Sequence, residues 1–202
     1  MRANPGADRR SFTELMRRRQ IVDAAIEVIA ERGYAKTSFG KIAERAGLSS
    51  TGMISYHFRN KDDLMNQVVL DIYARAAETV GARIEEEATA RGQLLAFITA
   101  SIDFYRDHHR HMRALAEISL GQRATANQAA RSRQQELADL EDLFRSGQRR
   151  GEFREFDPHV MALALRHALD GIALHLADDP NCDTGRCARE LASTFDLATR
   201  AV

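Results

Sequence analysis

Apolar residues along this chain recur at the three- and four-residue spacing of a helix face, and no segment keeps the alternation that is typical of a strand. Glycines, prolines and short polar runs interrupt the pattern and divide it into helix-length segments. The expected helices cover about 12–32, 39–46, 50–57, 61–87, 91–107, 109–120, 124–147, 158–177 and 185–200. The sequence therefore predicts an all-α protein of about nine helices.

The second and third expected helices are short, and a turn at Gly47 joins them. Thr37 or Ser38 can cap the second helix, and Ser49 or Ser50 can cap the third. Two short helices joined in this way inside a three-helix unit describe a helix-turn-helix. An ordinary helical hairpin within a larger core would show the same apolar positions, so the spacing alone leaves both interpretations open.

Boundaries elsewhere have clearer signals. Gly33 is expected to stop the first helix, and Asn60 to cap the long fourth one. Asp157 before Pro158 marks another start, because a proline at the first helical position has no N–H to leave unpaired. We expect residues 1–60 to form an N-terminal arm and a helix-turn-helix domain. Residues 61–202 are then expected to form a larger helical domain.

Charge is unevenly placed along the chain. The formal net charge is zero, but residues 1–61 hold twelve Lys and Arg against six Asp and Glu, and they include all three lysines. A basic end on a neutral chain indicates a polyanionic partner for that end. A solvated helix face is the alternative interpretation.

The remaining composition is that of an ordinary globular protein, with 44% hydrophobic and 29% charged residues. We find no apolar run near the ~20 residues that cross a bilayer and no apolar secretory segment. Two cysteines cannot build a disulfide framework. A cytoplasmic location without a membrane partner is the expectation.

The predicted helix-turn-helix carries a specific set of short motifs. They are Gly33-Tyr34, Thr37-Ser38, Ile42-Ala43, Ala46-Gly47-Leu48-Ser49, Tyr56-His57-Phe58 and Asn60-Lys61, followed by Leu64. As a set, they resemble the tetracycline-repressor (TetR) family, and residues 151–176 are more weakly similar to that family's dimer helix. The resemblance implies a homodimeric transcription regulator whose first three helices bind double-stranded operator DNA. The other helices would bind a small ligand and the partner subunit.

The resemblance also implies which residues contact DNA. Relative to the family's commonest form, the segment after Ser49 is one residue longer, and Ser55 stands where a phosphate-contacting tyrosine is usual. Either Tyr56 takes that role or the recognition helix starts differently. Ile54 is expected to pack inside the domain. The candidate DNA contacts are Arg17, Arg18, Thr37, Ser38, Ser50, Thr51, Gly52, Met53, Ser55, Tyr56, His57 and Lys61.

The larger domain is expected to hold the ligand and the dimer interface. Aromatic and apolar positions suggest a pocket for a mainly apolar ligand, although most would be core without any pocket. The expected pocket residues are Tyr73, Phe97, Phe104, Tyr105, Met112, Leu115, Phe144 and His167. The expected interface residues are Met161, Leu165, Leu169, Ile172, Leu176, Leu191 and Phe195, about half of which we expect to belong to the chain's own core.

The sequence lacks the common catalytic motifs, so we do not expect an enzyme, and no cofactor is expected. His108 and His111 share a helical face and could bind a metal, but we favour a solvated corner between helices. Cys182 and Cys187 could form a redox switch, but we favour two free thiols. The function we predict is a ligand-responsive repressor that binds a palindromic operator as a homodimer. A helical ligand-binding or enzymatic protein without specific DNA binding is the alternative.

Overall fold

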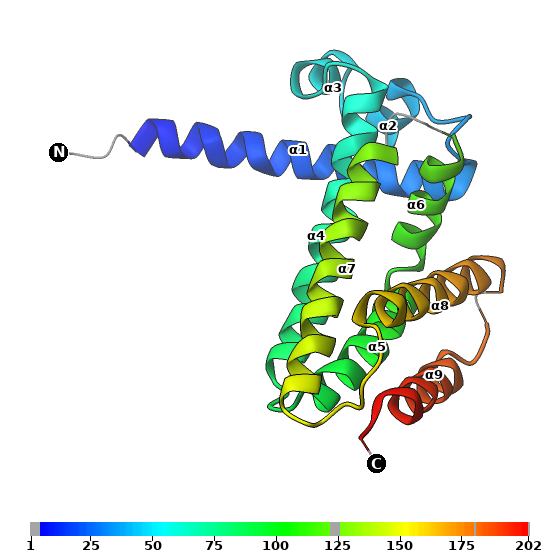
Figure 1. The fold of residues 1–202 in the computed structure, drawn as a ribbon. Coiled ribbons are helices and arrows are strands. Elements are labelled where there is room, and N and C mark those ends of the chain that lie inside the picture. The colour runs from blue at the N-terminus through cyan, green and yellow to red at the C-terminus, as the bar shows by residue number, and fades with distance from the viewer. Residues whose placement is uncertain (1–4, 122–125, 180, 202) are drawn as a thin grey trace.

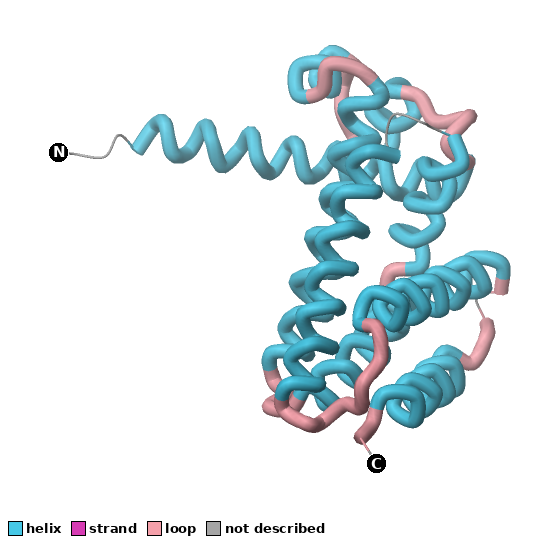
Figure 2. Tube along the Cα trace, viewed as in Figure 1, coloured by secondary structure: helices cyan, strands magenta, loops and turns pink. Residues whose placement is uncertain are grey.

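The computed structural model describes residues 5–121, 126–179 and 181–201, and within them it holds nine helices and no strand. The helices are α1 (Pro5–Arg32), α2 (Phe39–Arg45), α3 (Gly52–His57), α4 (Lys61–Glu85), α5 (Ala90–Asp107), α6 (His109–Gly121), α7 (Ala126–Arg149), α8 (Pro158–Asp178) and α9 (Thr184–Thr199). The predicted all-α class is therefore confirmed. Figure 2 shows that loops lie in the connections between helices and at the C-terminal end. A single isolated bridge pairs Phe153 with Arg200.

Most of the predicted helix boundaries hold. Gly33 follows α1 with a φ of 79°, a left-handed value that favours glycine. Ser38, Asn60 and Asp157 are the N-caps of α2, α4 and α8, and each side chain accepts a hydrogen bond from a backbone N–H in the first turn. Capping therefore explains why these three helices start where the sequence predicted.

Two starts differ from the prediction, and a third cannot be compared. The first helix begins at Pro5, not near residue 12. The predicted start of the seventh helix at 124 lies outside the described residues, and α7 begins at Ala126. The predicted serine cap of the third helix is wrong, because Thr51 is the N-cap of α3 and its side chain makes no capping bond. Thr51 already has helical backbone angles (φ −69°, ψ −17°), whereas a side-chain cap usually needs an extended residue.

A small core joins α1, α2 and α3 to the first half of α4. Ile21, Val28, Ile42, Ile54 and Leu64 are all fully buried there. Ala114 and Ile118 of α6 belong to the same cluster, so this helix packs against the N-terminal unit. In Figure 1 the N-terminal half of α1 projects from this end of the molecule.

A second core lies at the other end, among α5, α7, α8, α9 and the second half of α4. Leu94, Phe104, Phe144 and Leu165 are buried in it. Figure 1 shows α4 and α7 running side by side along the length of the molecule. The domain division at residue 60 stays a prediction, and α4 contributes to both cores.

One helix of the described chain, α8, is long and apolar enough to cross a bilayer, with a mean hydropathy of 1.3 over residues 158–177. The expectation that no such run exists is therefore wrong. The reason is that α8 is apolar on two sides: one side faces the core, and only 28% of the window is buried. A core helix passes the same test, and α8 packs on the core with one side while Val160 and Leu174 on its other side are exposed.

Candidate nucleic-acid interface and ligand pocket

The short helix α3 presents a polar, exposed face. Thr51, Gly52, Ser55 and Tyr56 are exposed, as is Ser50 just before the helix, and Tyr56 is 76% exposed. Met53 and His57 are partly exposed. Ile54 is fully buried, which confirms its expected packing. The remaining α3 candidates are thus free to meet a partner surface while Ile54 anchors the helix.

Lys61 starts α4 beside this face, but its ammonium group is already engaged. Its Nζ donates a hydrogen bond to the carbonyl oxygen of Tyr34 at 2.9 Å and lies 4.0 Å from the centre of the Tyr34 ring. Burial lowers the pKa of Lys61, while nearby Asp62 opposes that shift. A phosphate bound by Lys61 would therefore either share the ammonium group with the Tyr34 carbonyl or displace that carbonyl.

Thr37, a predicted phosphate contact, is engaged within its own domain. Its side chain is 4% exposed, and its hydroxyl donates to the carbonyl oxygen of Gly33 at 2.9 Å. The backbone N–H of Thr37 also donates to the carbonyl oxygen of Tyr34. The two hydrogen bonds together hold the turn after α1. Ser38 is exposed at the α2 N-terminus and remains a candidate.

The basic residues of α1 are only partly free. Arg17 donates to Gln20 of its own helix at 2.8 Å, whereas Arg18 donates to Gln67 of α4 at 2.7 Å and lies over the Phe58 ring. Arg18 therefore braces α1 against α4, a structural role that the sequence did not indicate.

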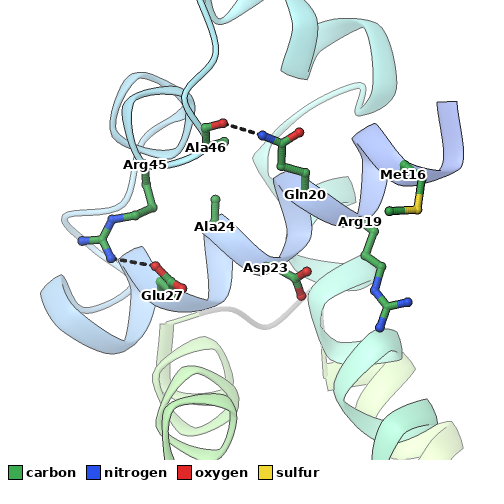
Figure 3. Close-up of a pocket in the computed structure, with 8 residues that line it drawn as sticks. All are labelled: Met16, Arg19, Gln20, Asp23, Ala24, Glu27, Arg45 and Ala46. Atoms are coloured by element: carbon green, nitrogen blue, oxygen red, sulfur yellow. Dashed lines mark hydrogen bonds and ion pairs between the residues drawn. The ribbon is translucent and has the colours of Figure 1, made fainter. Parts of the chain in front are cut away.

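A shallow hollow of about 400 Å³ lies between α1 and α2 (Figure 3). Gln20 donates to the carbonyl of Ala46 across it at 2.6 Å, which fixes the helix-turn-helix turn on α1. Arg45 binds Glu27 and Glu31 of α1. The charge of Arg45 is therefore balanced within the domain and adds little to the basic surface.

Tyr34 joins three parts of the molecule, which sequence reasoning missed. Its backbone N–H donates to Glu117 of α6 at 3.0 Å, while its carbonyl holds Lys61 of α4. Its ring packs so closely on Gly121 that an added Cβ there would lie 2.2 Å from Cδ1 of the ring. We call Tyr34, Glu117 and Lys61 the Tyr34 joint.

A cavity of about 730 Å³ opens among α4, α5, α6, α7 and α8. Its α4 wall runs from Leu70 to Ile84, a span of about 21 Å at the rise of an α-helix. The cavity is lined by six of the eight residues predicted to form a pocket. They are Tyr73, Phe97, Phe104, Tyr105, Met112 and Leu115.

Phe144 and His167 are wrong as pocket residues. Phe144 is fully buried in the second core, where it meets Phe153 and Phe156 edge-on. His167 has a side chain that is 74% exposed, on the outer side of α8 near Asp170. Both predictions failed because hydrophobicity and helix spacing do not say which neighbour a side chain meets.

A charged network that was not predicted from the sequence lies in the cavity wall. The Arg166 guanidinium donates to Glu136 of α7 at 2.6 Å, to Asp170 at 2.8 Å and to the Tyr105 hydroxyl at 2.9 Å. Burial opposes the Arg166 charge, but Tyr105, Glu136 and Asp170 outweigh it and raise its pKa above the usual value. The sequence did contain one signal of this network: Arg166 and Asp170 are four residues apart within the apolar segment 158–177.

Four of the seven predicted interface residues are buried inside their own chain, in line with the expectation that about half of the set belongs to the core. They are Leu165, Leu169, Leu176 and Phe195. Met161, Ile172 and Leu191 are partly exposed. The exposed side of α8 lies one or two positions earlier along the helix than the predicted residues. It holds Val160, Ala164, His167, Gly171 and Leu174, which we call the α8 outer stripe.

Two smaller candidates also have a place in the fold. His108 stacks on Phe104 at 4.2 Å between ring centroids and meets His111 edge-on. Within the described residues, no three His, Cys, Asp or Glu side chains are grouped to hold a metal ion. Cys182 and Cys187 are free thiols, and burial raises the pKa of Cys182, as does its neighbour Cys187.

Comparison with known sequences matches residues 21–68 to the family described as "Bacterial regulatory proteins, tetR family". A fatty acid metabolism regulator protein of Bacillus subtilis is 36% identical over 90 residues, which are 45% of this chain and 46% of that protein. The transcriptional regulator BetI of Cronobacter sakazakii is 29% identical over 192 residues, 89% of each chain. The match to the Bacillus subtilis protein, at 36% identity, thus spans about half of that protein's length.

Solved structures share the whole fold. The fatty acid degradation regulator FadR of Bacillus halodurans has a TM-score of 0.82 at 20% identity, covering 97% of each chain. FadR of Bacillus subtilis, in complex with stearoyl-CoA, has a TM-score of 0.79 at 24% identity, covering 87% of this chain and 96% of that one. At these identities the likeness is one of fold.

Proposed function

Because the chain belongs to the tetR family of bacterial regulatory proteins, we propose that it is a ligand-responsive repressor. It binds a palindromic operator as a homodimer and is released by a small, mainly apolar effector. The observation that carries this proposal is the exposed polar face of α3 on a helix-turn-helix unit. The α3 helix has only six residues, which is enough for a recognition helix whose N-terminal residues contact base edges in the major groove.

The contacts to DNA divide into two kinds. Lys61 and Tyr56 reach the sugar-phosphate backbone, while Thr51 and Met53 meet base edges, where a threonine hydroxyl and a methionine side chain can contact a base and a thymine methyl. The excess of basic residues in 1–61 supports this assignment. The alternative, a helical ligand-binding protein or enzyme without DNA binding, leaves the exposed α3 face without a use.

The α8 outer stripe is the proposed centre of the dimer interface. Val160 and Leu174 are 59% and 60% exposed, and Leu197 of α9 is 58% exposed. Large exposed apolar side chains grouped on neighbouring elements favour a protein partner. A two-fold pairing of these helices would cover the side of α8 that the chain leaves open.

Effector binding is proposed to reach the DNA through the Tyr34 joint. The cavity is lined by Met112 and Leu115 of α6, and the same helix holds Tyr34 through Glu117. Two recognition helices of a dimer must lie about 34–36 Å apart to enter successive major grooves. A shift of α4 and α6 on ligand binding would change this spacing and lower DNA affinity.

The test is a gel shift with DNA that flanks the protein's own gene, at two salt concentrations. Binding should weaken steeply as salt rises, since phosphate contacts dominate. Lys61→Ala should weaken binding on all sequences, and Thr51→Ala should chiefly change sequence preference. Arg83→Ala, an exposed basic residue near the other end of α4, is the matched control and should bind as the parent does. No shift on any flanking fragment at low salt would reject the repressor.

A further inference from the structure

We propose that the effector is a cationic amphiphile: a long apolar body that carries one amine or quaternary ammonium group. This inference deepens the proposed function, because it names the ligand class of the same cavity. It rests on the shape of the cavity, on where its polar residues lie, and on their charge balance.

The cavity has one polar and one apolar end. The α4 and α5 helices form an antiparallel hairpin, so Tyr73 lies at the same end as Tyr105, and Ile84 lies at the other. At the Tyr73 end, α7 and α8 contribute Arg133, Glu136, Arg166 and Asp170. At the Ile84 end the lining is almost wholly apolar. It consists of Val80, Gly81, Ile84, Phe97, Leu140 and Leu143, together with Gln93.

This gradient fits a ligand with a tail and a head. The tail would lie along α4 toward Ile84, where burial of each CH₂ group contributes about 0.8 kcal/mol in transfer free energy. The head would lie beside Tyr73 and Tyr105. Met112 and Leu115 of α6 line the cavity too, so the ligand would contact the helix that leads to the Tyr34 joint.

The charge balance of the lining selects the sign of the head. The lining holds three carboxylates, Glu136, Asp139 and Asp170, against two guanidinium groups, Arg133 and Arg166. One negative charge is left in excess. A cationic head would balance that charge, whereas an anionic head would add a second one in a partly desolvated site.

Arg166 does not provide a free positive site for an anion. Its two terminal nitrogens already donate to Glu136, Asp170 and the Tyr105 hydroxyl. Its Nε–H has no acceptor among the described residues, but this nitrogen is buried and has almost no exposed surface. Carboxylate oxygens are better placed to receive a ligand: the second oxygen of Glu136 accepts no hydrogen bond from the described residues.

Aromatic rings add a second attraction for a cation. Tyr73 and Tyr105 line the cavity at its charged end. Burial raises the pKa of both hydroxyls, so they stay neutral and the rings keep their ordinary electron-rich faces. Carboxylates and tyrosine rings together are the groups that bind alkylammonium heads.

The test uses three probes that share one ten-carbon chain and differ in the head: decyltrimethylammonium, decanol and decanoate. Calorimetric titration of the free protein below micelle-forming concentration gives each dissociation constant. Decyltrimethylammonium should bind at least about tenfold more tightly than decanoate, a difference of about 1.4 kcal/mol. Decanoate binding as tightly, or no binding by any probe, would overturn the proposal.

Two variants and a control locate the binding. Glu136→Gln should reduce the preference for the cation at least about threefold, and Asp142→Asn, an α7 acid with an 80% exposed side chain outside the cavity, should leave it unchanged. Gly81→Leu fills the apolar end without touching the charged network and should weaken all three probes. If Gly81→Leu left binding intact, the probes would be on the surface and the proposal would fail.

These measurements need no DNA. A failed gel shift with intact cation preference would reject the repressor and keep the ligand assignment. A salt-sensitive gel shift together with equal binding of the cation and the anion would keep the repressor and reject the ligand assignment.

Discussion

Gly147 of α7 lies where only a hydrogen atom fits. An added Cβ would lie 2.1 Å from Cδ2 of Phe153. The Phe153 ring is 3% exposed and packs edge-on against Phe144, so it has little room to move. A glycine inside a helix is therefore retained here for packing, despite its poor helix propensity.

Gly147→Ala is expected to lower the free energy of unfolding by about 1–3 kcal/mol, the usual cost of an overpacked core. Urea unfolding followed by circular dichroism measures this change. The matched control is Gly81→Ala in α4, where an added Cβ meets no atom within 4 Å. That control should gain about 0.5–1 kcal/mol from helix propensity, and a gain at Gly147 as well would contradict the packing argument.

Individual contacts were only partly predictable from the sequence. Ile54 could be placed in the core because its neighbours in α3 are polar, and six pocket residues followed from apolar spacing. Thr37 could not be placed, because its hydroxyl bonds to a backbone carbonyl that no motif specifies. The bond from Tyr34 to Glu117 joins residues 83 positions apart, a separation at which local patterns carry no signal.

At the scale of elements, helix starts followed the capping chemistry. Ser38, Asn60 and Asp157 begin their helices as predicted because each accepts bonds from first-turn N–H groups. The start of α3 was missed because three consecutive hydroxyl residues, Ser49 to Thr51, are equally good caps by type. Backbone angles decide among them, and these depend on how the turn packs.

The Tyr34 joint links three elements, and the three lysines of the chain make it testable. Reductive methylation with ¹³C gives each lysine an NMR signal. Glu117→Ala removes the acceptor of the Tyr34 N–H and should loosen Tyr34, so the depressed pKa of Lys61 should rise toward about 10.4, the ordinary lysine value. The signals of Lys36 and Lys41 serve as internal controls.

The conservative variant separates this linkage from a general loss of structure. Glu117→Gln keeps an oxygen that can accept the Tyr34 N–H bond, so the Lys61 pKa should stay close to that of the parent. An unchanged Lys61 titration in Glu117→Ala would show that α6 does not hold Lys61 through Tyr34.

For the whole molecule, the outstanding feature is an apolar side of α8 that the fold leaves open. The sequence predicts an interface on α8 and α9, but four of the seven residues predicted for it pack inside the chain. Both sides of α8 are apolar, so helical periodicity alone does not separate them. Only the position of the other helices shows which side is free.

Leu174→Glu places a charge on the α8 outer stripe and should convert the proposed dimer into a monomer of 22.6 kDa. Light scattering at micromolar concentration measures the mass. Leu120→Glu is the matched control, because Leu120 of α6 is 88% exposed and directly precedes Gly121, which packs on Tyr34 beside the helix-turn-helix. A parent protein that is already monomeric would contradict the proposed dimer.

The charge imbalance described for residues 1–61 has a consequence for kinetics. The described part of this segment, residues 5–61, lies at one end of the molecule around the start of α4, and the opposite charge belongs to the rest of the chain. A neutral protein built in this way behaves as a dipole. It is turned by the field of a polyanion before contact, so productive collisions begin basic end first. Added salt should therefore slow association, in addition to weakening the finished complex.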